Sequence, residues 1–363
     1  MPYRATQVSQ DPLDYFMRHD DEEPHLRVSD VILRSNHSKK EVFARLIRMA
    51  TNSQWSHSAF VSTVNDPSKG LENTFLIEAK TKGVIIASWR NEVMPYNTFT
   101  VGIKRPKLDW YRESPAEVAR RDVHDPEDRH GIDYLRHVRD VALDQIHGLY
   151  DHKVVWELAS LYVERVAHRH LGRLPQAAEG ADKLAELFKK WDTQHSPDAH
   201  VMHFICSGLV QYSFFAALRF RLLQDLKHPG QRESALHNLR NMQHILYRED
   251  PQQIMEQYVQ RLAANEQELA EPVPDDVQDL LKTALPADFH NSPDLEWRYI
   301  VLNGTVWQID DAPTGYLPQS ADEASVLAMI HPEHSSVGSD HDQPPEETEV
   351  SEAQASRALH TSG

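Results

Sequence analysis

The chain has 363 residues, with 38 Lys and Arg against 55 Asp and Glu, and its formal net charge is −17 with histidines neutral. This acidity argues against nucleic-acid binding as the main function, because the phosphate backbone attracts basic surfaces. A single cysteine excludes an intramolecular disulfide, which is typical of a reducing compartment.

The N-terminus lacks the apolar segment of a signal peptide, and no apolar run approaches the roughly 18 residues of a membrane span. We therefore expect a cytoplasmic protein without stable membrane insertion, and specialised export remains open. The oligomeric state is left undecided.

The first half of the chain predicts an antiparallel sheet followed by helices. Residues 1–24 are polar and predict an N-terminal arm with a short helix over 13–17. Apolar and β-branched runs bounded by turn residues predict strands over 28–34, 54–64, 74–79, 84–87 and 99–103. The short turns between these strands favour a meander. Helical spacing of apolar residues predicts helices over 40–49, 132–146, 154–171 and 176–191.

The second half is less regular. Residues 225–283 are interpreted as a helical insertion. Residues 284–312 are expected to rejoin the domain formed by 25–224, and they include a predicted hairpin across Asn303-Gly304, a dipeptide typical of two-residue hairpin turns. Residues 331–363 have no Phe, Trp or Tyr and much Ser and Glu, which predicts a disordered acidic tail.

The segment around the only cysteine is a candidate for chemistry. The apolar run after Cys206 is long enough to be a mostly buried helix. Ser207 and Gly208 suit a first helical turn, so Cys206 is expected at the N-terminus, where the helix dipole stabilises an anion by about 0.3 to 1 kcal/mol. A nearby imidazolium would lower the thiol pKa further. The alternative is an inert cysteine, because free Cys is among the most buried residue types.

A thiol nucleophile needs an imidazole and a polar group that orients it. His57 lies in one predicted strand and Glu78 in the next, and adjacent strands are about 4.8 Å apart, so Glu78 can reach His57. Strand periodicity places His57 on one face with three apolar residues, Trp55, Ala59 and Val61. Two alternatives remain open: one of 22 histidines can be merely structural, and Glu78 can be a strand-edge charge in water.

Several short motifs occur in one order along the chain. They are Asp30-Val31-Ile32-Leu33, Trp55-Ser56-His57-Ser58-Ala59, Ile77-Glu78-Ala79, Gly148-Leu149-Tyr150-Asp151, Ile205-Cys206-Ser207-Gly208-Leu209-Val210 and Leu285-Pro286-Ala287-Asp288-Phe289. This ordered set resembles the permuted papain-like amidases typified by YaeF and YiiX, in the circularly permuted branch of the NlpC-type thiol hydrolases. The resemblance covers roughly residues 28–106, 142–222 and 284–309.

The resemblance implies an α+β fold of the circularly permuted papain-like (NlpC-type) class, in which a small antiparallel sheet packs on the helix bearing the cysteine. It implies Cys206 as nucleophile, His57 as general base and then acid, and Glu78 as the orienting third member. Tyr150 matches the family's Tyr-Asp motif. The resemblance therefore implies that Tyr150 lies near the thiol and helps to stabilise the oxyanion. The backbone N–H of Cys206 or Ser207 is a second candidate donor.

The chain also departs from the family pattern. It has Ser29-Asp30 where the family often has Gly-Asp, and Gly208 where an acidic residue is common. Residues 225–283 are an addition, and the export signal often found in the family is not seen. These differences bear on the substrate more than on the catalytic apparatus.

We therefore predict a cysteine-dependent amidase or peptidase that acts through a thioester and needs no cofactor or metal. The expected partner is a peptide- or lipid-like acyl substrate, because a lipid acyl hydrolase or acyltransferase of the same fold is an alternative. A non-catalytic binding protein on this scaffold is another. A metal site has weaker support, because neither HExxH nor CxxC spacing accompanies its candidate histidines. These are His124, His130, His137, His147 and His152. A phosphate-binding GxxxxGK[ST] loop is also absent from the sequence.

Overall fold

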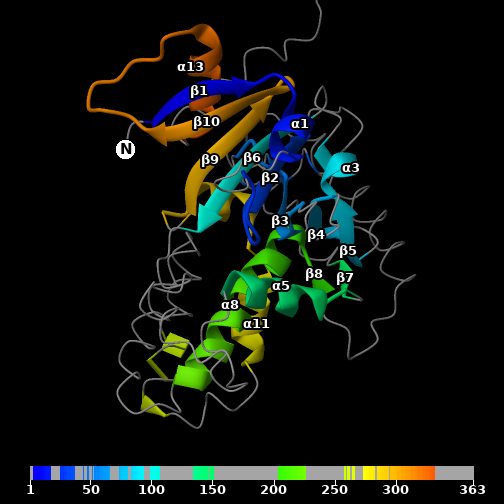
Figure 1. Cartoon of the computed structure of the whole chain (residues 1–363). Coiled ribbons are helices and arrows are strands. Elements are labelled where there is room, and N and C mark those ends of the chain that lie inside the picture. Colours follow the sequence, from blue (N-terminus) through cyan, green and yellow to red (C-terminus); the bar gives the residue numbers. More distant parts are fainter. Residues whose placement is uncertain are drawn as a thin grey trace, which may run out of the picture.

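The computed structural model describes residues 3–17, 25–36, 44, 47–48, 51, 53–65, 73–80, 83–93, 99–106, 134–146, 148–150, 203–225, 257–258, 260–261, 264–265, 273–282, 284–293 and 295–331. In these parts the chain is α+β, with one large antiparallel sheet and helices packed against it (Figure 1). No helix within these ranges combines the length and apolarity that crossing a membrane requires.

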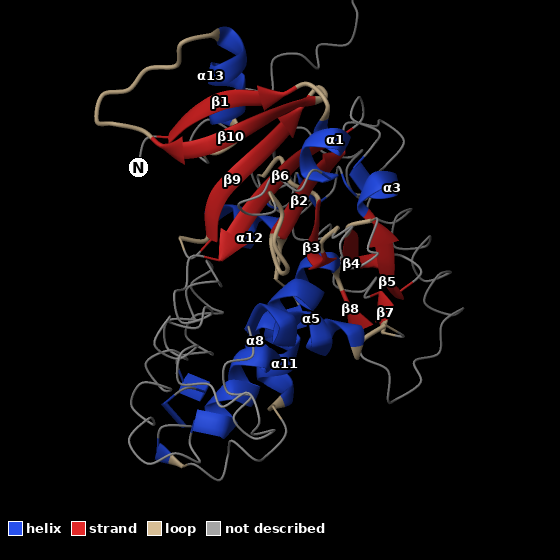
Figure 2. Ribbon diagram, viewed as in Figure 1, coloured by secondary structure: helices blue, strands red, loops and turns tan. Residues whose placement is uncertain are grey.

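The sheet has the strand order β1-β10-β9-β6-β2-β3-β4-β5, and every neighbouring pair is antiparallel (Figure 2). Its strands are β1 (Tyr3–Ser9), β2 (Val31–Asn36), β3 (His57–Thr63), β4 (Phe75–Lys80), β5 (Gly83–Ser88), β6 (Phe99–Pro106), β9 (Leu295–Leu302) and β10 (Thr305–Asp311). The expectation of a small sheet is therefore corrected. The additional strands join through β6, which pairs with β2 on one side and with β9 on the other.

The predicted meander is confirmed for β2 to β5, which pair in chain order, whereas β6 returns to the free side of β2. Val31, Ile32 and Leu33 of β2 are all fully buried, as expected of a central strand covered on both faces. The sequence alone does not reveal which edge of the meander β6 joins.

The predicted hairpin is confirmed. Leu302 of β9 lies opposite Thr305 of β10, and Asn303 and Gly304 have φ angles of 51° and 79°. Positive φ at both positions is what a type I′ turn requires.

The N-terminal segment supplies β1, an edge strand paired with β10. Ala5 is the one buried residue of β1. The strand therefore lacks the alternation of apolar and polar residues by which a strand is recognised in a sequence. The short helix expected nearby is present as α1 (Pro12–Met17). On the other side of β1, Glu323 of α13 (Ala321–Ala328) accepts a 3.1 Å hydrogen bond from the Ala5 N–H.

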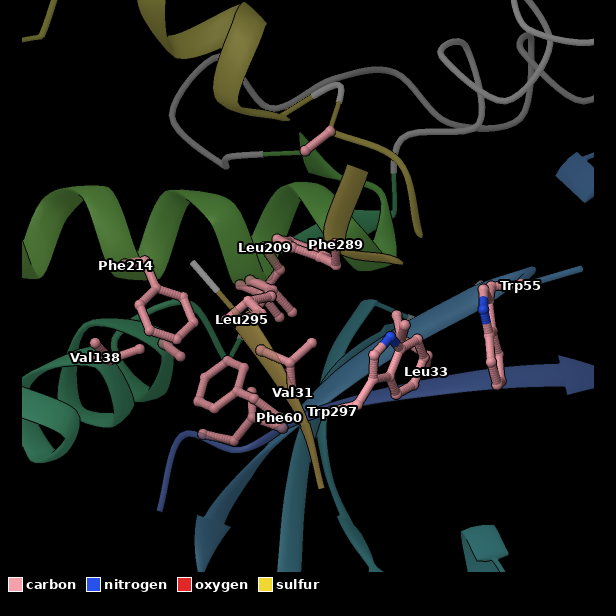
Figure 3. Packing of buried hydrophobic residues seen from close by; sticks show 14 of the residues in the cluster. Val31, Leu33, Trp55, Phe60, Val138, Leu209, Phe214, Phe289, Leu295 and Trp297 are labelled. Atoms are coloured by element: carbon pink, nitrogen blue, oxygen red, sulfur yellow. The ribbon is translucent and has the colours of Figure 1, made fainter. Parts of the chain in front are cut away.

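The central helix α8 spans Cys206–Asp225 and begins at the predicted residue. It packs on β3 and β4 and is flanked by α5 (Tyr134–Leu143) and α11 (Asp275–Lys282). A helix covered in this way is apolar around most of its circumference. In Figure 3, Leu209 and Phe214 lie over Phe60 of the sheet, and burial of each such side chain contributes about 1.5 to 3 kcal/mol.

Buried side chains form a cluster on each face of the sheet. One cluster includes Phe60 together with five residues of α8, which are Leu209, Val210, Phe214, Phe215 and Ala217. The other includes Ala59 and Val61, which pack with Phe16 of α1 and Trp89 of α3 (Trp89–Val93). The remaining elements are β7 (Leu149–Tyr150), β8 (His203–Phe204) and α12 (Pro286–Asn291).

Some expectations fall outside the described residues. These are the helices over 154–171 and 176–191, most of the helix over 40–49, most of the insertion over 225–283, and the tail after residue 331. The last part of the insertion is described and contains α11, which packs against α8.

Candidate active site

His57 is the first residue of β3 and lies opposite Arg34 of β2. Phe60 lies opposite Ile77, so continuing this register places Glu78 of β4 diagonal to His57 on the same face of the sheet. Diagonal neighbours are within reach of long side chains. Three strands thus direct an imidazole, a carboxylate and a guanidinium toward one another.

His57 and Glu78 form a short, largely buried pair. His57 Nε2 lies 2.6 Å from Glu78 Oε2, and the side chains are 17% and 0% exposed. The alternative of Glu78 as a strand-edge charge in water is therefore wrong. A carboxylate that accepts from Nε2–H fixes the tautomer and leaves Nδ1 to exchange a proton elsewhere.

Two cations accompany the Glu78 carboxylate. Arg34 Nη2 donates to Oε2 at 3.2 Å, and Lys80 Nζ lies 2.8 Å from Oε1 as an ion pair. Burial raises the pKa of Glu78, but the hydrogen bond and charge of His57 and the charges of Arg34 and Lys80 lower it to about 2. Glu78 is therefore ionised at neutral pH.

The cysteine lies at the start of α8. The Leu209 N–H donates to the Ile205 carbonyl at 3.1 Å, so Cys206 belongs to the first turn, where helical N–H groups have no i−4 acceptor. Cys206 is 2% exposed, and the His57 side chain and the Ser58 backbone lie close enough to its thiol to lower the thiol pKa. The two residues that begin β3 therefore meet the residue that begins α8.

Electrostatics favour an ion pair at this junction. Burial raises the pKa of the Cys206 thiol, but the His57 charge and hydrogen bonds with His57, Ser58 and Ser207 lower it to about 7. Burial and the Arg34 charge lower the pKa of His57, whereas the Cys206 charge and the hydrogen bonds to Cys206 and Glu78 raise it, and the net shift is upward. A thiolate beside an imidazolium is the reactive form of a cysteine nucleophile.

Ser207 and Tyr150 were expected to help stabilise the oxyanion, and the structure describes the side chain of Ser207 but only the backbone of Tyr150. Ser207 is fully buried, and its Oγ lies 3.7 Å from Cys206 Sγ. Its backbone N–H shares the first turn of α8 with the N–H of Cys206. Tyr150 of β7 pairs with Phe204 of β8, two residues before the cysteine. This places the Tyr150 backbone near the site, and its side chain lies outside the described part of the structure.

Trp55 does not share the His57 face as strand periodicity predicts. It precedes β3, and it packs in the cluster with Phe60, whereas Ala59 and Val61 pack in the other cluster. Strand alternation applies only within the extended segment, which begins at His57.

Three charged residues near the site were not predicted from the sequence: Arg34 and Lys80, which contact the Glu78 carboxylate, and Glu92, which contacts both of these cations. Lys80 had a usable signal, because it is two residues from Glu78 in one strand and therefore shares its face. Arg34 and Glu92 had none, because their approach depends on strand register and on the position of α3.

The metal-site alternative involves five histidines. Of its five histidines, His137 on α5 is described, and the other four lie outside the described residues. Within the described ranges, no group of three or more His, Cys, Asp or Glu side chains is arranged to hold a metal ion.

The chain was also compared with known proteins. No protein-family model matches it, and a search of curated proteins gave no significant match.

Proposed function

We propose that this protein is a cysteine-dependent hydrolase, an amidase or peptidase, in which Cys206, His57 and Glu78 act together through a thioester intermediate. The observation that carries the proposal is the 2.6 Å contact between His57 Nε2 and the buried Glu78 Oε2, beside a Cys206 thiol whose pKa the same imidazole lowers. This arrangement supplies a nucleophile, a proton carrier and an orienting group.

In the acylation step, the Cys206 thiolate attacks the carbonyl carbon, and an electron pair moves to the carbonyl oxygen. The N–H groups in the first turn of α8 are candidates to stabilise that oxyanion. When the tetrahedral intermediate collapses, the carbon–nitrogen bond breaks and the imidazolium of His57 gives its proton to the leaving amine. The product is a thioester on Cys206.

In the deacylation step, His57 takes a proton from water as the water oxygen attacks the thioester carbon. The carbon–sulfur bond then breaks and releases a carboxylic acid and the Cys206 thiolate, and the proton that His57 retains restores the thiolate–imidazolium pair. Glu78 remains ionised throughout and holds the imidazole in one orientation.

Two features support membership of the permuted papain-like class. The strands with His57 and Glu78 precede the helix with Cys206, the order expected of the permuted branch. Ser29 has a φ of 68°, a conformation that glycine adopts without strain, which accounts for a family preference for Gly-Asp at this place. The Asp30 that follows is buried and accepts two hydrogen bonds from Arg105, at 2.8 and 2.7 Å.

The test is the pH dependence of Cys206 alkylation by iodoacetamide in the wild type and in His57→Ala. Cys206 is the only thiol, so no other cysteine contributes to the signal. We expect an apparent thiol pKa near 7 in the wild type and a higher value in His57→Ala. Because the thiol is buried, the midpoint of the pH profile, and not the absolute rate, is the readout.

The ultraviolet absorbance of the thiolate, measured against Cys206→Ser, gives the same midpoint without requiring reagent access. A midpoint at or above the ordinary pKa of cysteine, or one that does not change in His57→Ala, would contradict the hydrolase proposal and favour a binding protein. A low, His57-dependent midpoint justifies a comparison of amide and acyl-ester substrates, with amides expected to be cleaved. Selective cleavage of long-chain acyl esters would move the assignment to a lipid acyl hydrolase.

A further inference from the structure

Glu78 belongs to a closed ring of four alternating charges. Arg34 Nη1 lies 2.6 Å from Glu92 Oε2, and Lys80 Nζ lies 2.5 Å from the same oxygen. The same two cations contact Glu78, with Arg34 at Oε2 and Lys80 at Oε1. Each cation therefore bridges two carboxylates, one of which orients the imidazole of His57.

The ring is assembled by three separate elements of the fold. Arg34 comes from β2, Glu78 and Lys80 from β4, and Glu92 from α3. Arg34 is further fixed because its Nη1 also donates to the Glu92 backbone carbonyl at 3.2 Å. Its planar guanidinium can serve both carboxylates at once, which the single ammonium of a lysine does less well.

The charges in this ring must nearly balance for the thiol and imidazole to form an ion pair. Two cations beside one carboxylate would leave an excess positive charge near His57, which disfavours the imidazolium. Glu92 supplies the second negative charge, and its side chain is only 18% exposed, so water screens it incompletely. Among the described residues, the charged and titratable groups facing His57 directly or through this ring are Arg34, Glu78, Lys80, Glu92 and Cys206.

We propose that Arg34, Lys80 and Glu92 are positioning residues for the reaction: the two cations hold Glu78 where it orients His57, and Glu92 offsets their charge on the Cys206–His57 pair. This inference rests on the thiol-hydrolase function proposed above. It assigns a role to three residues that do not touch the reacting atoms.

The proposal predicts shifts of opposite sign from two substitutions in one ring. Glu92→Gln removes a negative charge, so it lowers the apparent pKa of Cys206. Arg34→Gln removes a positive charge, so it raises that pKa. Each shift is expected to be about 0.5 to 1 pH unit, the scale of a single charge acting through a partly buried site. A merely structural role would weaken both variants without separating the signs.

Matched controls come from the opposite end of the sheet. Asp310→Asn and Arg4→Gln remove the same charges from an ion pair of 3.8 Å between β10 and β1, at the edge of the sheet farthest in strand order from β5. Both controls are expected to leave the midpoint of Cys206 within error of the wild type. Arg34→Lys keeps the positive charge, so its thiolate midpoint should equal that of the wild type, in contrast to Arg34→Gln. This is expected even where hydrolysis stays slow.

The measurement is the thiolate absorbance midpoint of full-length variants, referred to Cys206→Ser. Opposite shifts in Glu92→Gln and Arg34→Gln, with unmoved controls, would support the inference. Shifts of the same sign, or none larger than in the controls, would overturn it while the proposed function stands. Failure of His57→Ala to raise the wild-type midpoint would instead overturn the proposed function. If Arg34→Gln does not fold, the midpoints of Glu92→Gln and Arg34→Lys are compared instead. The first variant changes the charge of the ring and should lower the midpoint, whereas the second keeps the charge and should not.

Discussion

Arg34 and His57 face each other across β2 and β3, and their side chains converge on one oxygen atom, Glu78 Oε2. The carboxylate that orients the imidazole is therefore itself oriented by a cation on the neighbouring strand. Because Glu78 is fully buried, loss of either contact leaves a charge with no water to compensate it.

Glu78→Gln should reduce hydrolysis by about 10²- to 10⁴-fold, because a neutral amide neither stabilises the imidazolium nor enforces the tautomer. The measurement is single-turnover hydrolysis of the substrate identified in the amide and ester comparison, with folding checked by circular dichroism. The acidic residue Asp310 at the far edge of the sheet offers a control, since Asp310→Asn should retain full activity. Near-normal turnover in a folded Glu78→Gln would remove Glu78 from the mechanism.

Glu78 also predicts acid sensitivity of the fold. Its pKa is lowered from 4.5 to about 2, so its contribution to stability is fully present above pH 4.5 and is lost as the pH falls toward 2. That contribution is of the order of 3 kcal/mol. Urea denaturation of the wild type and of Glu78→Gln across this range should show that the free energy of unfolding falls more steeply with decreasing pH in the wild type. Parallel curves would mean that the carboxylate is not held in its charged form.

His290 should act over a different pH range. Burial and the charge of Lys104 lower the pKa of His290 from 6.5 to about 4, and its Nε2 lies 3.0 Å from the Ile330 carbonyl. Stability from this neutral imidazole is complete above pH 6.5 and declines as the pH falls through 4, by about 3 kcal/mol. His290→Gln keeps a possible N–H donor but does not titrate, so its stability should change less between pH 6.5 and 4. An unchanged wild-type slope in the variant would refute this assignment.

Gly102 marks a tight approach between the sheet and two indole rings. A Cβ at this position would lie 2.7 Å from Trp297 Cζ3 and 2.8 Å from Trp55 Cη2. Gly102→Ala should therefore lower the free energy of unfolding by about 1 to 3 kcal/mol through overpacking. Chemical denaturation followed by tryptophan fluorescence measures it. Trp55→Phe should cost less stability in the Gly102→Ala background than in the wild type, and full additivity of the two changes would argue against the clash.

Local features of this chain were predictable because short-range preferences encode them. The start of α8 at Cys206 follows from a first-turn sequence leading into an apolar run, and the hairpin at Asn303-Gly304 follows from the positive φ angles that these residues tolerate. The strands carrying His57 and Glu78 were found in the same way. Their roles in chemistry remain a proposal.

The amino-acid sequence was therefore sufficient for most strands of the large sheet, for the helix that begins at Cys206 and for the three candidate residues on these elements, because dihedral preference and periodicity act over a few neighbouring residues. The tertiary structure alone brings β6 back to β2, extends the sheet with β1, and places Arg34 against the Glu78 carboxylate and Glu92 against Arg34 and Lys80. Strand order and register depend on which distant surfaces bury one another, and a shift of one residue would turn Arg34 to the other face. The surroundings of the candidate site were set by that long-range packing.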